Sequence, residues 1–91
     1  MLLENKTVLI MGIRNKWSIA WGAARSAADN GAKVLFTFMG EENREKIGDL
    51  ISEIPNAKAY ECDASSDELI QECFEKIKAE NGKLDGILHS I

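Results

Sequence analysis

The chain alternates between short, continuous apolar runs and longer segments in which apolar residues recur at helical spacing. Residues 7–11 and 34–38 are continuous apolar runs, which is typical of strands buried on both faces of a sheet. Residues 58–62 form a shorter and weaker run of the same kind, and residues 84–90 form a fourth. The pattern therefore predicts four strands.

The segment between the first two strands predicts a helix over residues 18–30. It is rich in alanine and contains no proline. Ser18 stands at its start, where a serine side chain can cap the first turn. Gly31 follows its end, where glycine readily adopts the positive φ of a helix terminus.

Two further helices are predicted between the later strands. A charged stretch after residue 40 leads into apolar residues spaced as on one helical face, and Pro55 ends that segment. Ser65 and Glu68 match the S-x-x-E capping box ahead of the last helix, and Gly82 is expected to end it. The apolar positions are Ile47, Leu50, Ile51 and Ile54 in the second helix, and Leu69, Ile70, Cys73, Phe74 and Ile77 in the third.

Strands that alternate with helices through short loops predict parallel strands joined by right-handed crossovers. We expect one α/β domain over residues 1–91, with no second domain: a Rossmann-like, doubly wound parallel sheet of order 3-2-1-4, truncated after its fourth strand. Ligands of such sheets bind outside the carboxyl ends of the strands, where the strand order reverses. Here that point lies between the ends of the first strand (Met11, Gly12) and of the fourth (His89, Ser90).

Length and charge exclude several classes of function. The chain has 91 residues, 11 basic against 15 acidic side chains and a formal net charge of −4, whereas a general nucleic-acid binder usually shows a basic excess. Its longest clean apolar run, residues 8–11, is too short to span a bilayer, and the first residues lack the pattern of a secretory signal. We therefore expect a cytoplasmic protein without nucleic-acid or membrane partners.

The two cysteines and the single histidine do not match a metal site. Cys62 and Cys73 are separated by ten residues, and His89 is the only histidine, whereas a zinc site needs about four ligands at characteristic spacings. The preferred interpretation is two small buried apolar side chains, with a disulfide or a reactive thiol as the alternative. No metal site is predicted.

The loop after the first strand is the expected site of the chemistry. Gly12 lets the backbone turn tightly beside a ligand, and the unpaired N–H groups of the following helix favour an anion such as a pyrophosphate. Ser18 either caps that helix or donates its hydroxyl to phosphate. The short-chain dehydrogenase pattern T-G-x-x-x-G-x-G is not kept, because Met11, Lys16 and Ser18 stand at its threonine and its second and third glycines.

A longer string is more specific. Gly12, five residues, and then Ser-Ile-Ala-Trp-Gly at 18–22 resemble the bacterial NADH-dependent enoyl-acyl-carrier-protein reductases, which belong to the short-chain dehydrogenase superfamily. Residues 31–38, 62–63 and 85–91 are similar to that family in the same order and spacing. The resemblance covers essentially the whole chain but only about the N-terminal third of a family member, so we interpret the chain as a fragment.

The resemblance implies which residues meet the cofactor, NADH or NAD. It assigns Gly12, Ser18 and Ile19 to the pyrophosphate and the nicotinamide ribose, and places Ser90 and Ile91 beside the ribose at the end of the fourth strand.

The same resemblance places three residues at the adenosine end of the cofactor. Met39 falls where the family contacts adenosine, and Asp63 and Ala64 fall where the adenine is held. Met39 cannot accept a hydrogen bond from the ribose 2′-hydroxyl, and Ala64 offers the adenine little apolar surface. Without the resemblance, Asp63 reads as a turn former ahead of a helix; with it, a contact to the adenine amine is favoured.

The residues after the second strand favour NADH over NADPH. A 2′-phosphate needs arginine or lysine there, but Glu41 and Glu42 come first and would repel it, and Arg44 is the first base.

The resemblance also implies what the chain does not contain. Enoyl reductases transfer a hydride to an enoyl thioester carried by acyl carrier protein, using a tyrosine and a lysine that follow the fourth strand. Tyr60 is the only tyrosine, and Asp67 stands where a Tyr-x(6)-Lys pair would need lysine. No catalytic residue is predicted, and we expect the chain alone to be inactive.

Two alternatives stay open. The chain could be a fragment of another short-chain dehydrogenase, such as a ketoacyl reductase, or a non-enzymatic nucleotide-binding scaffold of the flavodoxin-like kind. The strand order of the predicted fragment leaves its fourth strand as an apolar sheet edge, so we expect a homo-oligomer or self-association through it.

Overall fold

Seven elements alternate along the chain in a computed structural model, which describes residues 3–11, 19–63 and 65–89. The predicted order is confirmed. The elements are β1 (Thr7–Met11), α1 (Ile19–Asp29), β2 (Lys33–Phe38), α2 (Glu41–Ile51), β3 (Lys58–Glu61), α3 (Asp67–Asn81) and β4 (Gly86–His89).

The four strands form one parallel sheet in the order β3-β2-β1-β4, as predicted. The central strand β1 pairs with β2 on one side and with β4 on the other, so Met11 lies level with both Thr37 and His89. At the opposite end of the sheet, the Thr7 amide donates to the Asp85 carboxylate and the Asp85 amide donates to the Thr7 carbonyl, each at 2.8 Å. This reciprocal pair fixes where β4 starts against β1.

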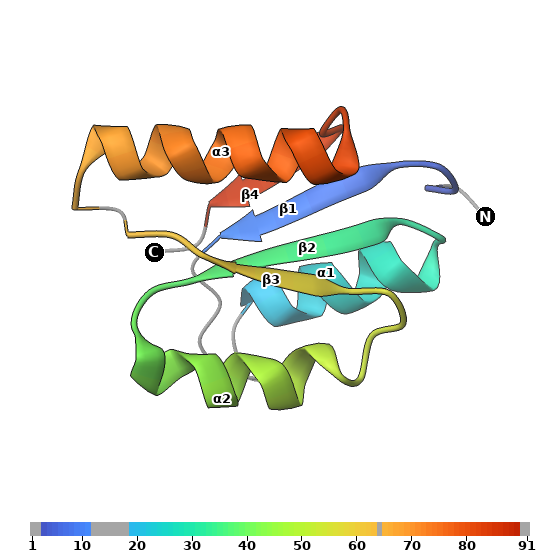
Figure 1. Ribbon diagram of the computed structural model, residues 1–91. Helices are drawn as coiled ribbons and strands as arrows, with labels where there is room; N and C mark the ends of the chain where they lie inside the picture. Colours follow the sequence, from blue (N-terminus) through green and yellow to red (C-terminus); the bar gives the residue numbers. More distant parts are fainter. Residues whose placement is uncertain (1–2, 12–18, 64, 90–91) are drawn as a thin grey trace.

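Helices cover both faces of the sheet, with α1 and α2 on one face and α3 on the other (Figure 1). Each face has its own apolar core, because successive side chains of a buried strand point to opposite faces. The core under α1 and α2 contains Ile10, Trp21, Ala24, Val34, Phe36, Phe38, Ile47, Leu50 and Ile54. The core under α3 contains Leu9, Met11, Leu35, Tyr60, Cys62, Cys73 and Ile77.

The end of α2 differs from the prediction. The apolar spacing predicts a helical face that reaches Ile54, but the helix ends at Ile51. Ile54 is nevertheless buried, because a tighter turn continues the chain: the amide of Glu53 donates to the Leu50 carbonyl and that of Ile54 to the Ile51 carbonyl. A run of i→i+3 bonds keeps a side chain close to the helical face without continuing the helix.

The start of α3 corrects the predicted capping box. The N-cap is Ser66, whose hydroxyl accepts from the Leu69 amide at 3.4 Å, and not Ser65. Leu69, expected on the buried face, is exposed, whereas Cys73 and Ile77 are buried as predicted. Gly82 ends α3 with a φ of 77°, in the region predicted for it.

Candidate functional site

The carboxyl ends of the four strands lie at one edge of the sheet, and the strand order reverses there between β1 and β4. The β1-α1-β2 connection covers one face and α3, which leads into β4, covers the other (Figure 1). The two connections therefore diverge from this point, which is where doubly wound sheets hold their ligands. We call this edge, from Met11 across to Asp63, the carboxyl edge.

Two of the predicted site residues are described with their side chains at the carboxyl edge, and both follow strand ends. Met39 comes directly after β2, and Asp63 comes two residues after β3. The amide of Cys62 donates to the Phe38 carbonyl at 2.8 Å, so the pairing of the two strands continues up to these residues. Met39 and Asp63 therefore follow the carboxyl ends of two paired strands, β2 and β3.

The remaining predicted residues belong to the glycine loop, to the start of α1, to the position after Asp63 and to the end of the chain. Ile19 is the first residue of α1. Gly12, Ser18, Ala64, Ser90 and Ile91 lie outside the described residues. Of the three residues expected at the adenosine end, the structure therefore describes Met39 and Asp63.

Asp63 forms a short turn ahead of α3. Its Oδ1 accepts a hydrogen bond from the Ser65 amide at 2.9 Å, the i→i+2 bond of an Asx turn. Hydrogen bonds from the Ser65 hydroxyl and the Ser65 amide lower the pKa of the Asp63 carboxyl below its ordinary value of 3.8. Asp63 is therefore an anion at neutral pH, and a carboxylate can accept further bonds beyond those from Ser65.

Met39 lies on an ordered corner between β2 and α2. Its carbonyl accepts from the Asn43 side-chain amide at 2.7 Å, and the Asn43 backbone amide donates to Gly40 at 3.2 Å. Gly40 has a φ of 87°, which only glycine adopts readily, so the chain turns sharply here. The Met39 side chain itself is 52% exposed, which leaves its thioether stem available to a flat apolar partner.

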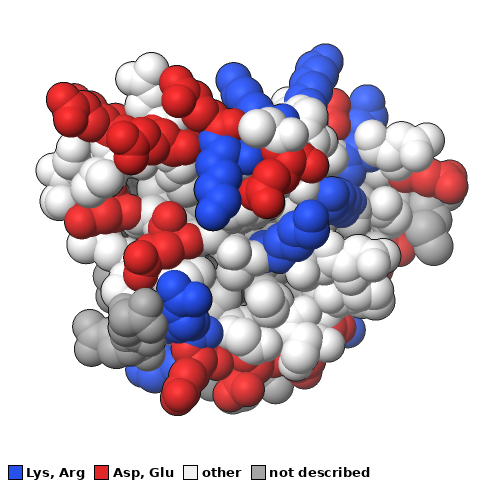
Figure 2. Space-filling model, in the orientation of Figure 1, with Lys and Arg blue, Asp and Glu red and all other residues white. Residues whose placement is uncertain are grey.

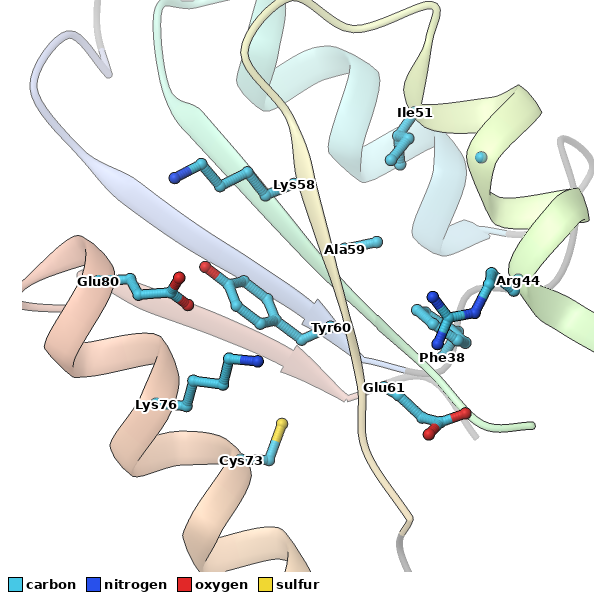
Figure 3. A pocket seen from close by; sticks show the side chains of 11 residues that line it. Phe38, Arg44, Ile51, Lys58, Ala59, Tyr60, Glu61, Cys73, Lys76 and Glu80 are labelled. Carbon is cyan, nitrogen blue, oxygen red and sulfur yellow. The ribbon is translucent and has the colours of Figure 1, made fainter. Parts of the chain in front are cut away.

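Arg44, the first basic residue after β2, packs against Phe38, the last residue of that strand. Its guanidinium carbon lies 5.5 Å from the centroid of the Phe38 ring, within the range of a cation–π contact. Figure 3 shows Arg44 beside Phe38 and Glu61 at the outer side of β3. In this position Arg44 faces the sheet edge formed by β3.

A hollow of about 800 Å³ runs along the outer side of β3, between α2 and α3. We call it the β3 hollow (Figure 3). Its lining includes neither Met39 nor Asp63, and it mixes basic with acidic side chains: Arg44, Lys58 and Lys76 with Glu61 and Glu80. The hollow therefore contains neither of these two predicted site residues, although Phe38 and Glu61, the last residues of β2 and β3, belong to its lining.

The visible surface, like the lining of the β3 hollow, carries charges of both signs. Figure 2 shows Lys and Arg side chains interspersed with Asp and Glu side chains on the side of the molecule where α3 lies above and α2 below. In the part of the chain that the structure describes, no helix is both long and apolar enough to cross a membrane. Over the same residues, His, Cys, Asp and Glu side chains form no group of three that could hold a metal ion.

A family model described as enoyl-(acyl carrier protein) reductase matches residues 12–91. The chain belongs to this family. The NADH enoyl-acyl-carrier-protein reductase of Enterococcus faecalis is 45% identical over 91 residues, which is all of this chain and 36% of that protein. An NADPH enzyme of the same family from Staphylococcus aureus is 44% identical over 91 residues, covering 98% of this chain and 36% of that protein. The chain thus spans about a third of the length of these enoyl reductases.

Solved structures of the family share the fold. The Bacillus cereus enoyl reductase, crystallised with NADP+ and an indole naphthyridinone, matches with a TM-score of 0.88 at 40% identity over 94% of this chain and 34% of that one. The Anaplasma phagocytophilum enzyme with NAD matches with a TM-score of 0.89 at 31% identity, over 96% of this chain and 33% of that one. Enoyl reductases similar to this chain thus include structures with either dinucleotide.

The interpretation of Asp63 as a turn former ahead of α3 is confirmed, because its carboxylate accepts from the Ser65 amide. One residue that supports the site was not predicted: the Asn43 side-chain amide donates to the Met39 carbonyl. No spacing in the sequence indicates this contact, because it depends on where α2 begins.

Proposed function

We propose that this chain is the dinucleotide-binding part of an NADH-dependent enoyl-acyl-carrier-protein reductase. The observation that carries the proposal is the position of Asp63, an ionised carboxylate at the carboxyl edge of a 3-2-1-4 sheet, in a chain of the enoyl reductase family. Residues 1–91 form the N-terminal half of one Rossmann domain. In the whole protein, the cofactor supplies a hydride to an enoyl thioester carried by acyl carrier protein.

The adenosine end of the cofactor binds across the ends of β2 and β3. Asp63 accepts a hydrogen bond from the exocyclic amine of the adenine, and the turn with Ser65 keeps its carboxylate oriented. The exposed Met39 side chain packs on the adenosine, and Ala64 follows Asp63 against the adenine ring. The carboxylate fits this role because it is charged at neutral pH and the Ser65 amide already holds one of its oxygens.

The pyrophosphate and the nicotinamide ribose bind at the other half of the carboxyl edge. Gly12, Ser18 and Ile19 contact the pyrophosphate side, and Ser90 and Ile91 contact the ribose beyond β4. This assignment is supported by the topology, because β1 and β4 are neighbours whose carboxyl ends are level. The start of α1 at Ile19 supports the assignment as well, because the unpaired N–H groups of a first helical turn favour an anion such as the pyrophosphate.

NADH is the preferred cofactor. The chain turns from Met39 into α2 through two acidic residues, Glu41 and Glu42, which disfavour a 2′-phosphate. Arg44, the base that could oppose them, is engaged with the ring of Phe38, the last residue of β2. Calorimetric titration with NADH and NADPH tests this: we expect NADH to bind more tightly, and tighter binding of NADPH would overturn the preference.

The chain by itself does not carry out the reduction. It has one tyrosine, Tyr60, which is buried in β3 and bonded to Asn81 away from the carboxyl edge. The tyrosine that stabilises the enolate oxygen, and the lysine that orients the cofactor ribose, are then supplied by another part of a full-length protein. NADH oxidation with a crotonyl thioester should stay at the level of a protein-free control, and measurable turnover by the 91-residue chain would contradict this.

A further inference from the structure

The outer side of β3 is an unpaired sheet edge. β3 is the terminal strand of the order β3-β2-β1-β4, so within the described residues it pairs with β2 alone. The Cys62 amide donates to the Phe38 carbonyl, which directs the N–H of Cys62 toward β2. Because the backbone groups of successive residues alternate between the two sides of a strand, those of Tyr60 also face β2, and those of Ala59 and Glu61 point outward. Such an edge is a template for one more strand.

The centre of this edge is unobstructed. Sheet edges are commonly kept from pairing by lysine, by proline or by a covering helix. In β3 the charged residues Lys58 and Glu61 stand at the two ends, and Ala59 between them is small and uncharged. The helices α2 and α3 flank the edge, and the β3 hollow of about 800 Å³ lies between them (Figure 3). This volume is in the range of sites that bind a ligand.

The α2 side of the hollow is apolar and leaves room for a side chain. Ala59 packs on this side, and Ile51 and Gly48 belong to the lining. Gly48 lies inside α2, where glycine is less favourable than alanine, and a Cβ at this position would meet no packing neighbour within 4 Å. The packing of the fold therefore does not require glycine here, and its absent side chain widens the hollow toward α2. An apolar side chain of a bound strand fits this opening.

The α3 side of the hollow carries an excess of positive charge. Figure 3 shows Lys58 and Tyr60 extending from β3 toward the side of α3, where Lys76 and Glu80 also line the hollow. The Lys76 ammonium lies 6.0 Å from the centroid of the Tyr60 ring, and Glu80 lies next to the Tyr60 hydroxyl. Two lysines against one glutamate leave this side basic, although the chain as a whole has a net charge of −4. Acidic side chains of a bound strand are therefore complementary to it.

We propose that the β3 hollow binds an extended peptide of a partner protein, in which acidic and apolar side chains alternate, as a strand added to the sheet. Main-chain hydrogen bonds to Ala59 and Glu61 hold the peptide. Successive side chains of a strand point to opposite faces, so the acidic ones lie along Lys58 and Lys76 and the apolar ones face Gly48. Binding here does not depend on the assignment of the cofactor site, because the lining contains neither of the two described residues assigned to adenosine.

Hydrogen exchange of the 91-residue chain, followed by NMR, tests the added strand directly. The probe is a blocked peptide of alternating glutamate and valine, about six residues long. At saturating peptide we expect the amides of Ala59 and Glu61 to exchange about tenfold more slowly, because they gain acceptors. The amides of Tyr60 and Cys62, which face β2, are the internal controls and should change by less than about twofold. A peptide with lysine in place of glutamate should bind about tenfold more weakly.

Two pairs of matched variants locate the peptide within the hollow. Gly48→Leu fills the α2 side and should weaken binding of the glutamate peptide about tenfold, whereas Gly22→Leu, at an equally open position inside α1, should leave it unchanged. Lys76→Glu should weaken binding of the glutamate peptide and strengthen that of the lysine peptide. Lys78→Glu makes the same change of charge on α3 outside the lining, and it should change both affinities by less than about twofold.

Several outcomes would overturn the proposal. Absence of binding at about millimolar glutamate peptide, or equal binding of the glutamate and lysine peptides, would exclude a site for an acidic strand. Protection of Ala59 and Glu61 that rises with the concentration of the chain, without any peptide, would assign the edge to a second copy. Exchange of the wild-type amides decides between these outcomes even where a variant fails to fold.

Discussion

The Asn81 side-chain amide donates to the Tyr60 hydroxyl at 2.9 Å and so ties the last residue of α3 to β3. The same amide nitrogen also donates to the Ile77 carbonyl at 2.9 Å. Glu80 approaches the Tyr60 hydroxyl as well, and Lys76 lies 6.0 Å from the ring centroid (Figure 3). The packing of α3 on the sheet is therefore fixed at its end by a polar contact beside the apolar core.

Removing this contact should destabilise the chain. Asn81→Ala leaves the buried Tyr60 hydroxyl without its donor and should lower the free energy of unfolding by about 1–2 kcal/mol. Gln71→Ala is the matched control on the same helix, because its hydrogen bond to Glu75 is exposed, and it should change stability by less than about 0.5 kcal/mol. Urea unfolding measures both, and equal effects of the two variants would contradict the account.

Tyr60 should ionise above its ordinary pKa. Burial, opposed by the Asn81 bond and helped by Glu80, raises the pKa of the Tyr60 hydroxyl from 10.0. Because the folded-state pKa is the higher one, this group stabilises the fold fully below pH 10.0, and that stability is lost as the pH rises through the folded-state value. Tyr60 is the only tyrosine, so the tyrosinate absorbance reports it alone; a midpoint at or below 10.0 in the folded chain would contradict the burial.

Asp63 should matter for cofactor binding through its charge. Asp63→Asn can keep the turn with Ser65 but presents an amide to the adenine, so it should weaken NADH binding about tenfold. Asp67→Asn removes one charge from the exposed first turn of α3 and serves as the control, with NADH affinity close to that of the wild type. Calorimetry compares them, and equal affinities of the two variants would remove Asp63 from the site.

The same carboxylate has a defined pH window. Hydrogen bonds from Ser65 lower the pKa of Asp63 below 3.8, so its contribution to stability is present above that pH and is lost as the pH falls through the lower folded-state value. Its carboxyl carbon should therefore show an NMR titration midpoint below 3.8. In Ser65→Ala, which loses the hydroxyl, the midpoint should move upward, and an unchanged midpoint would assign the shift to another cause.

We also expect the outer side of β4 to self-associate. Within the described residues β4 pairs only with β1, and its Ile87 side chain is 55% exposed. Ile87→Lys places a charge on this edge and should reduce the association seen by sedimentation velocity. Leu69→Lys, at an exposed apolar position on α3, is the control and should leave it unchanged. A monomeric wild-type chain would contradict the expectation.

The strand pattern and the order of the sheet could be predicted because buried parallel strands are continuous apolar runs. Thr7–Met11 matches its predicted bounds, and the order β3-β2-β1-β4 follows from right-handed crossovers. The ends of the helices were predicted less well from the sequence. The i→i+3 turn after Ile51 buries Ile54 at a spacing that sequence alone cannot distinguish from continued helix.

Within the site, the sequence predicted where a residue lies relative to the strands better than it predicted which residues it contacts. The resemblance to the enoyl reductases assigned Asp63 and Met39 to the adenosine end of the cofactor, and the structure places both residues after strand ends. The choice between Ser65 and Ser66 as the cap depends on where α3 begins: Ser65 lies in the Asp63 turn, and Ser66, directly before the helix, caps it. Adjacent serines offer the same chemistry, so only the geometry of the turn distinguishes them.

The most direct test of the account is an amide NMR titration of the 91-residue chain with NADH. We expect the largest shift changes at the carboxyl edge, for the amides of Met39, Asp63 and Ser65 and those of the loop from Gly12 to Ser18. The amides around Lys58 and Lys76, in the β3 hollow, should change little. Shift changes confined to the β3 hollow, or none at saturating NADH, would contradict the claim that the carboxyl edge binds the dinucleotide.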